Sequence, residues 1–242
     1  MTNILDITFL VITLKDCPER MKYTKKLLTK HGLSHKIFTF KKNKIGWIGC
    51  LDSHIQLYKY AIKNKLRYIF ILEDNVCLSP YIDINNDFKR LFTIIKNKTD
   101  WDIILLGGFF SPLARCDSTE YSTLYKSTNT HGTSCYVINY RTCYRLIKQY
   151  KKGINQPIDV YISKNFRQFI YRPLLFYHRI VDSVTNPRFD LIRKFWFNPA
   201  IYRTVEIWFF EDKLQVITVY MASLLIFVIF LIATWFKSNK IR

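Results

Sequence analysis

The sequence predicts an α/β sandwich with a mostly parallel sheet, and two observations support this prediction. Short apolar segments typical of buried strands alternate along most of the chain with longer segments that carry helical signals. Hydrophobic residues make up 49% of the 242 residues, so the chain can bury a sizeable core and is not a disordered protein. Because strands that alternate with helices usually form a parallel sheet between helical layers, we expect one α/β domain.

The expected strands are short, apolar and rich in β-formers. The first, ITFLVITL, lacks the basic flank and the small-residue cleavage site of a signal peptide, so we interpret it as a buried strand. The last is interrupted by Pro173, which cannot donate to a sheet. The expected strands are Ile7–Leu14, His35–Phe40, Arg67–Leu72, Trp101–Leu106, Tyr136–Asn139 and Phe169–Tyr177.

The expected helices lie between these strands. The first opens with Pro18 and closes at Gly32, residue types that favour a helix start and a helix end. The segment GWIGCLDSHIQLYKYAIKNKL repeats its apolar residues at helical spacing and predicts a second helix. We expect a further helix over Tyr140–Lys151 and a loop over Ser111–Thr130, which is rich in Ser and Thr.

The charge and the cysteines restrict the function classes only partly. A formal net charge of +19 suits anionic partners such as nucleic acid, lipid headgroups or sugar nucleotides, but abundant lysine also serves simply as a solubilising residue. The six cysteines form no Cys-x-x-Cys pair, so a zinc ribbon or a redox motif is unsupported. Their scatter through apolar segments indicates buried free thiols and a reducing compartment.

An uncharged segment near the C-terminus predicts a membrane anchor. Residues 214–236, LQVITVYMASLLIFVIFLIATWF, match the length of a bilayer core and are flanked by basic and aromatic residues. We therefore expect a globular domain over 1–205, a juxtamembrane linker over 206–213, a transmembrane helix over 214–236 and a basic tail over 237–242. The positive-inside rule would place the tail in the cytosol, whereas a lone C-terminal anchor leaves the large domain there, and we favour a cytosolic domain.

The strand Arg67–Leu72 runs directly into Glu73, Asp74 and Asn75. Ligands of parallel α/β sheets bind beyond the carboxyl ends of the strands, where these residues should emerge. Clustered carboxylate and amide oxygens suit a hard divalent cation. A solvated strand end explains the same residues without a metal, and the local sequence does not decide between the two.

Several ordered motifs extend this interpretation. They are FLVITLKDCPERMKY, IGCLDSHIQLYKYAI, YIFILEDNV, DWDIILLGG, HGTSCYVIN, QPIDVYI and YRPLLFYHRIVDSV. From Ile7 to Thr185 the sequence therefore resembles glycosyltransferase family 25, which includes lipopolysaccharide-biosynthesis and collagen galactosyltransferases. The resemblance implies a GT-A-like nucleotide-sugar-binding fold and inverting transfer of galactose or glucose from a UDP-sugar to a glycan or glycoprotein hydroxyl, often with Mn2+.

The resemblance also implies roles for individual residues. Asp159 would be the general base or would bind acceptor hydroxyls, although a carboxylate after Pro157 is also typical of a helix start. A late histidine, His178, would approach the acidic cluster as a further metal ligand. The remaining assignments are nucleotide-sugar binding by Thr13, Leu14, Arg20 and Asp74, acceptor-side contacts by His54, Gly132 and Thr133, and metal binding by Glu73, Asp74, Asn75 and His178.

One departure from the family pattern leaves alternatives open. Asn75 stands where the family usually has Asp, and an amide oxygen ligates a cation without contributing negative charge, so metal affinity should fall. A catalytically impaired glycosyltransferase-like membrane scaffold or binding protein is therefore an alternative. A third hypothesis is a basic membrane-surface or nucleic-acid-binding protein. The sequence has no RNP motif, zinc spacing or clustered basic patch with interleaved aromatics, so we expect no nucleic-acid partner.

Overall fold

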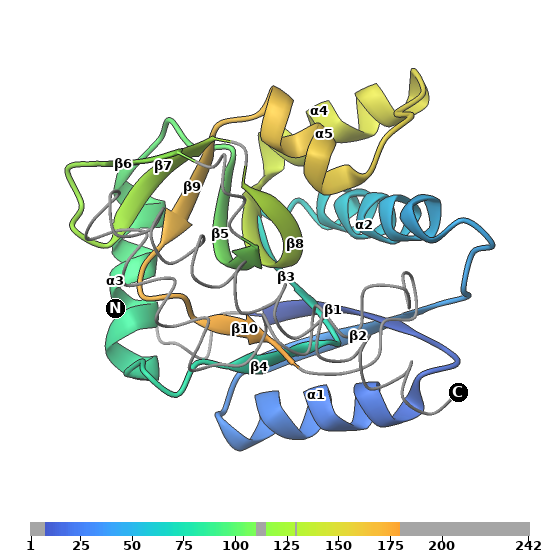
Figure 1. Ribbon diagram of the computed structural model, residues 1–242, viewed down its shortest axis with the longest axis horizontal. Helices are drawn as coiled ribbons and strands as arrows, with labels where there is room; N and C mark the ends of the chain where they lie inside the picture. Colours follow the sequence, from blue (N-terminus) through green and yellow to red (C-terminus); the bar gives the residue numbers. More distant parts are fainter. Residues whose placement is uncertain (1–7, 110–114, 129, 180–242) are drawn as a thin grey trace, which may run out of the picture. The chain divides into compact units, whose positions relative to one another are not determined.

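The computed structural model describes residues 8–109, 115–128 and 130–179, all within one compact unit of the chain, Met1–Phe197 (Figure 1). An eight-stranded sheet has the order β2-β1-β3-β8-β5-β9-β7-β6, and β10 pairs with β4 in a small second sheet. The strands are β1 (Thr8–Leu14), β2 (Ser34–Phe40), β3 (Tyr68–Glu73), β4 (Val76–Leu78), β5 (Ile103–Phe109), β6 (Arg115–Ser118), β7 (Leu124–Thr128), β8 (His131–Asn139), β9 (Gln168–Tyr171) and β10 (Phe176–His178).

The helices begin and end where local signals favour it. In α3 the Asp83 side chain accepts a hydrogen bond of 3.1 Å from the backbone N–H of Asn86, and in α4 Asn139 accepts one of 2.9 Å from that of Thr142. Both satisfy N–H groups that a helix start leaves unpaired. In the described ranges the helices are α1 (Pro18–Lys30), α2 (Gly46–Lys63), α3 (Ile84–Asn97), α4 (Tyr140–Lys151) and α5 (Ile158–Asn165).

The sheet is mixed, with most of its strands running in one direction. β1 is parallel to β2 and β3, and β5 is parallel to β9, whereas β8 lies antiparallel between β3 and β5 and β7 antiparallel between β9 and β6. The predicted α/β fold with a mostly parallel sheet is therefore confirmed, with β7 and β8 as the reversed strands. Because β8 runs against β3, with Cys135 opposite Leu72, the first residues of β8 lie beside the end of β3.

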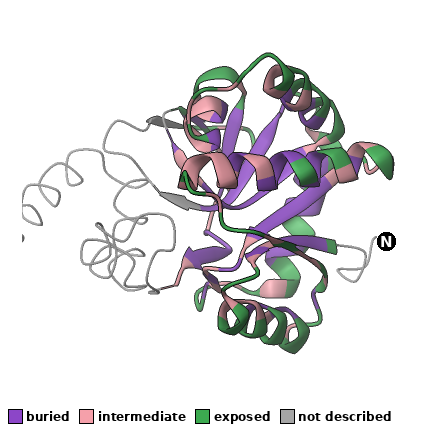
Figure 2. Ribbon diagram, turned by 90° about the vertical axis from the view of Figure 1, so that its right-hand side faces the viewer, coloured by how far each residue is buried: buried purple, intermediate pink, exposed green. Residues whose placement is uncertain are grey.

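Helices cover both faces of the sheet (Figure 1). On one face, Phe9 and Val11 of β1 pack in a continuous core with Leu28 of α1 and Phe88 of α3. On the other face α2 packs against α4 and α5, which contact β8. The central strands β1, β3, β8 and β9 are mostly buried, whereas the edge strand β2 is exposed or half-buried (Figure 2). Burial of each large apolar side chain contributes about 1.5–3 kcal/mol, so this core dominates stability.

Two expectations about the elements were wrong, and two further elements were not predicted. The segment Ser111–Thr130 is not a continuous loop, because it contains β6 and β7, and Thr- and Tyr-containing segments such as LYKST fit a half-buried strand. The sequence interpretation also missed α3 and β4. The predicted strand Phe169–Tyr177 is divided between β9 and β10, which belong to different sheets on either side of the cis Arg172–Pro173 peptide bond.

The C-terminal expectations concern residues that the structure does not describe. Within 8–109, 115–128 and 130–179, no helix combines the length and the apolar character needed to cross a bilayer. The predicted transmembrane helix 214–236, its linker 206–213 and the tail 237–242 lie outside the described residues.

Candidate functional site

Glu73 and Asp74 project to opposite faces of the sheet. Adjacent residues of a strand alternate between faces, and Glu73 is the last residue of β3. The Glu73 carboxylate lies against α2 and β8, whereas that of Asp74 lies against β1 and α1. The predicted acidic cluster is therefore divided between two groups of side chains that share one edge of the sheet.

The Asp74 side gathers the residues predicted to bind the nucleotide sugar. Thr13 Oγ1 donates a hydrogen bond of 2.6 Å to Asp74 Oδ2, and Arg20 Nε lies 3.4 Å from Asp74 Oδ1. The Thr24 hydroxyl of α1 donates to the backbone oxygen of Asp74 over 3.2 Å, and Leu14 ends β1 beside this group. Thr13, Leu14, Arg20 and Asp74 are thus brought together at the carboxyl ends of β1 and β3.

The Asp74 carboxylate holds this group together and is itself hidden, with a side-chain exposure of 8%. Desolvation raises the pKa of Asp74 above its ordinary value, and the opposing Thr13 hydrogen bond and Arg20 charge do not cancel this effect. Arg20 Nε is buried beside this carboxylate, and the guanidinium carries four further N–H donors with which it can contact an anionic ligand.

The Glu73 side gathers the predicted acceptor-side residues. Thr133 Oγ1 donates to Glu73 Oε1 over 3.3 Å, and His54 Nε2 lies 3.5 Å from the same oxygen. Desolvation raises the pKa of Glu73, but His54, His178 and the Thr133 hydroxyl lower it more, so its pKa falls below the ordinary value. A partly exposed, ionised carboxylate therefore faces solvent at the end of β3.

His54 is fixed by a chain of buried tyrosines. Its Nδ1 lies 2.7 Å from the Tyr136 hydroxyl, which lies 2.7 Å from the Tyr58 hydroxyl. All three side chains are fully buried, and the His54 and Tyr136 rings are stacked. These contacts hold the imidazole with Nε2 toward Glu73.

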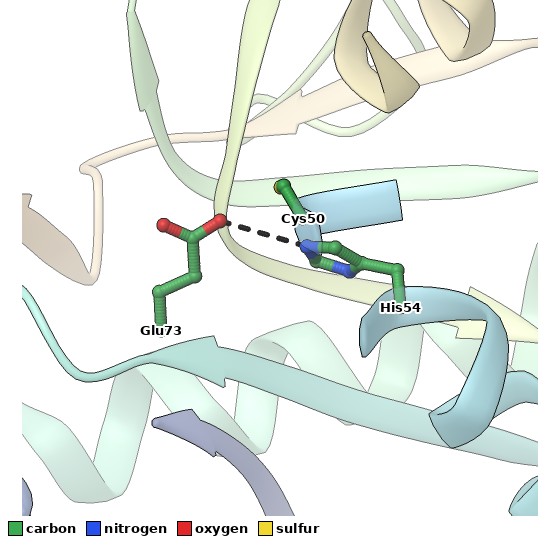
Figure 3. Close-up of side chains that lie close together, drawn as sticks. All are labelled: Cys50, His54 and Glu73. Carbon is green, nitrogen blue, oxygen red and sulfur yellow. Dashed lines mark ion pairs between the residues drawn. The ribbon is translucent and has the colours of Figure 1, made fainter. Parts of the chain in front are cut away.

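Cys50 also lies on the Glu73 side of the sheet, one helical turn before His54 in α2 (Figure 3). Its Sγ, a nitrogen of His54 and a carboxylate oxygen of Glu73 all lie within 4.8 Å of one another. Desolvation, followed by the charges of Glu73 and Asp159, raises the pKa of the Cys50 thiol well above its ordinary value. The thiol is therefore protonated at neutral pH and is not an activated nucleophile.

Asp159 lies on the Glu73 side, in the first turn of α5. Its Oδ2 accepts a hydrogen bond of 3.3 Å from the backbone N–H of Gly132, and its Oδ1 accepts one of 2.9 Å from that of Val160. Gly132 has a φ of 100°, a conformation that favours glycine. Two adjacent residues of β8, Gly132 and Thr133, thus contact the carboxylates of Asp159 and Glu73.

The other two predicted metal ligands follow the same strand end. Asn75 Oδ1 is buried and accepts no hydrogen bond from the described residues, and the backbone oxygen of Asn75 accepts one of 2.7 Å from Arg179 N–H. His178 lies opposite Val76, close enough to lower the pKa of Glu73. Among the described His, Cys, Asp and Glu residues, the group with potential ligand atoms this close is Cys50, His54 and Glu73, not Glu73, Asp74 and His178.

Sequence reasoning missed three residues of this site. Cys50 belongs to the motif IGCLDSHIQLYKYAI but had no predicted role, although Cys50 and His54 stand four residues apart, the spacing that places two side chains on one helical face. Tyr58 and Tyr136 had no polar signal, because both fall at apolar positions of a helix and a strand. Their hydroxyl contacts depend on the packing of α2 against β8.

The comparison with known families identifies the class of this enzyme. The sequence pattern of glycosyltransferase family 25 (LPS biosynthesis protein) matches residues 41–162, which include α2, β3, β8 and the start of α5. The chain belongs to glycosyltransferase family 25. It is therefore a transferase, and the resemblance seen in the sequence is confirmed. The comparison with curated protein sequences gave no match.

Solved structures with a similar chain path include a glycosyltransferase involved in the glycosylation of the major capsid of PBCV-1, with a TM-score of 0.43, 10% identity and coverage of 71% of this chain and 93% of that one. The apo form of a UDP-glucose pyrophosphorylase also has a TM-score of 0.43 and 10% identity, with coverage of 71% of this chain and 76% of that one. A nucleoside-diphosphate-sugar pyrophosphorylase from Vibrio cholerae RC9 has a TM-score of 0.37 and 10% identity, with coverage of 72% of this chain and 77% of that one.

Proposed function

We propose that this enzyme transfers a hexose, galactose or glucose, from a UDP-sugar to a hydroxyl of a glycan or glycoprotein, with inversion at the anomeric carbon. The observation that carries the proposal is the pair Gly132 and Thr133, whose contacts hold Asp159 and Glu73 on one side of the β3 end. The opposite side holds Thr13 and Arg20 against Asp74. A carboxylate pair and a basic anion-binding group at one sheet edge are what glycosyl transfer from a nucleoside diphosphate requires.

The donor half consists of Thr13, Leu14, Arg20 and Asp74. Asp74 holds the Arg20 guanidinium through its Nε, and the remaining N–H groups of a guanidinium can donate charged hydrogen bonds to a diphosphate. The overall positive charge of the chain favours the approach of the same anionic donor.

The acceptor half consists of Asp159, His54, Gly132 and Thr133. Asp159 takes the proton from the acceptor hydroxyl as its oxygen bonds to the anomeric carbon, and the bond from that carbon to the diphosphate oxygen breaks to release UDP. The N–H of Gly132 orients the Asp159 carboxylate for this step. Attack from the face opposite the leaving group gives inversion.

A divalent cation fits the residues at the β3 end. Because a buried carbonyl oxygen is rarely left without a partner, the unpaired Oδ1 of Asn75 suits a hard cation as ligand. Asn75, Glu73 and His178 would hold the ion, and Asp74 would act mainly through Arg20. When bound, Mn2+ would neutralise charge on the departing diphosphate.

The test measures donor binding and hydrolysis by the full chain with UDP-galactose and UDP-glucose, with Mn2+ and with a chelator. We expect one donor to bind and to be hydrolysed slowly. Arg20→Gln should weaken binding at least about tenfold, since a charged hydrogen bond contributes about 1.5–3 kcal/mol. The matched control is Lys26→Gln, which removes an exposed charge from the same helix.

Failure of the folded protein to bind any UDP-sugar would overturn the proposal. Donor binding without hydrolysis or transfer would instead favour the impaired, scaffold-like alternative that Asn75 raises. The predicted membrane anchor at 214–236 stays a prediction and is not needed for this experiment.

A further inference from the structure

Cys50, His54 and Glu73 form a donor set whose cysteine has no role in the proposed glycosyl transfer. They offer a sulfur, an imidazole nitrogen and a carboxylate oxygen within 4.8 Å of one another (Figure 3). Manganese and magnesium favour sites built from oxygen, whereas sulfur together with imidazole suits zinc. The chemistry of this set therefore differs from that of the oxygen-rich strand end at Asn75.

The orientation of His54 points independently to a ligand. Its Nε2 is buried and lacks a hydrogen bond to any described residue, although it lies 3.5 Å from Glu73 Oε1. Its other nitrogen, Nδ1, is held by the Tyr136 hydroxyl at 2.7 Å. Histidines that bind metals usually have one ring nitrogen fixed by such an outer partner, which leaves the second nitrogen to face the metal.

The backbone already places the three side chains for coordination. Cys50 and His54 are four residues apart in α2 and share a helical face, and Glu73 approaches from the end of β3. Zinc bond lengths of about 2.0–2.3 Å hold tetrahedral ligand atoms about 3.3–3.7 Å apart. The His54–Glu73 separation of 3.5 Å already falls in this range, and the Cys50 sulfur lies within 4.8 Å of both other ligand atoms.

We propose that Cys50, His54 and Glu73 bind a thiophilic divalent cation, zinc above all, and leave the other positions of the ion to water. Binding forms a zinc–sulfur bond and releases the Cys50 thiol proton to solvent. The site does not depend on the proposed hexose transfer. Glu73 is, however, also a candidate ligand of the hard cation, so zinc at this site competes for Glu73 and inhibits the transferase.

The first test titrates the full chain with Zn2+ and with Co2+ in the absence of any sugar nucleotide. We expect one ion per chain at this site and a thiolate-to-cobalt charge-transfer band in the near ultraviolet. Cys50→Ser should abolish the band and weaken zinc binding at least about 100-fold, more than the roughly tenfold loss expected when Tyr136→Phe removes the outer partner of His54. Cys17→Ser, which removes another partly exposed free thiol, is the control and should keep the band.

The second test needs no variant and so does not depend on how Cys50→Ser folds. Iodoacetamide is added to the wild-type chain with and without Zn2+, and the alkylation rate of each cysteine is followed by mass spectrometry of its peptide. We expect zinc to slow the alkylation of Cys50 at least about tenfold relative to Cys17. Unchanged Cys50 alkylation at saturating zinc, or a cobalt band that survives in a folded Cys50→Ser variant, would overturn the proposal.

Discussion

The Thr13 hydroxyl donates a 2.6 Å hydrogen bond to Asp74 Oδ2 across 61 residues of sequence. Both residues are almost fully buried, with exposures of 1% and 6%. The bond joins the ends of β1 and β3 beneath α1 and satisfies a carboxylate that would otherwise be costly to bury. The same hydrogen bond therefore stabilises the fold and fixes the Asp74 carboxylate of the proposed donor site.

Thr13→Val should lower the free energy of unfolding by about 1–3 kcal/mol, because valine keeps the shape of threonine but leaves the buried carboxylate short of one donor. Urea unfolding measures the change. Thr8→Val, at the exposed start of the same strand, is the control and should stay within about 0.5 kcal/mol of wild type. Equal losses in the two variants would contradict the role given to this bond.

Asp159→Asn should lower kcat for hexose transfer by about 10²–10⁴-fold and leave the UDP-sugar Kd unchanged, since the amide cannot accept the acceptor proton. Steady-state kinetics and equilibrium donor binding separate the two effects. Asp117→Asn removes an exposed carboxylate from β6 and should change neither. A larger loss of kcat in Glu73→Gln than in Asp159→Asn would indicate that Glu73, not Asp159, is the general base.

Gly107→Ala should lower the free energy of unfolding by about 1–3 kcal/mol or more, because the new Cβ would lie 2.6 Å from the backbone oxygen of Phe176. Thermal unfolding provides the measurement. Gly32→Ala is the comparison, since a Cβ there meets nothing within 4 Å and only the left-handed backbone, φ 65°, is strained. A milder effect of Gly107→Ala than of Gly32→Ala would contradict the role given to the close contact between β5 and β10.

Tyr171→Phe should make stability less sensitive to alkaline pH. The Tyr171 hydroxyl donates to Asp87 Oδ1 over 3.1 Å, and desolvation, followed by the Asp87 charge, raises the pKa of Tyr171. The unfolded chain ionises this tyrosine near pH 10, so the stability present below that pH is lost as the pH rises through the folded pKa.

Urea unfolding between about pH 9 and 11 should therefore show a steeper decline for wild type than for Tyr171→Phe, by up to about 1.4 kcal/mol per pH unit. Tyr144→Phe removes a hydroxyl from an exposed ring and should decline like wild type. Parallel declines in all three proteins would argue against a raised Tyr171 pKa.

Local signals in the sequence were sufficient for elements whose ends are set by their own residues. The helix Tyr140–Lys151 was predicted to the residue, because the Asn139 cap fixes its start. The strand pair β6 and β7 was not, since its Ser- and Thr-rich residues become strand only by pairing with each other and with β9. The reversed direction of β8 is likewise a property of the assembled sheet.

The candidate site divides in the same way. The acidic residues at the end of β3 could be found from the sequence, because an apolar strand leads directly into them. The partner of each carboxylate could not be predicted from the sequence, because it depends on which helix covers each face of the sheet. His54 therefore meets Glu73 and Arg20 meets Asp74, contacts between residues far apart in sequence.

The division of Glu73 and Asp74 between the two faces constrains how this enzyme can evolve. A single inserted or deleted residue in β3 would reverse the facing of every side chain beyond it and exchange the two carboxylates between their partners. The strand can therefore accept substitutions but not changes of length. Lineages that diversify their acceptors should vary the surrounding loops and keep the length of this strand constant.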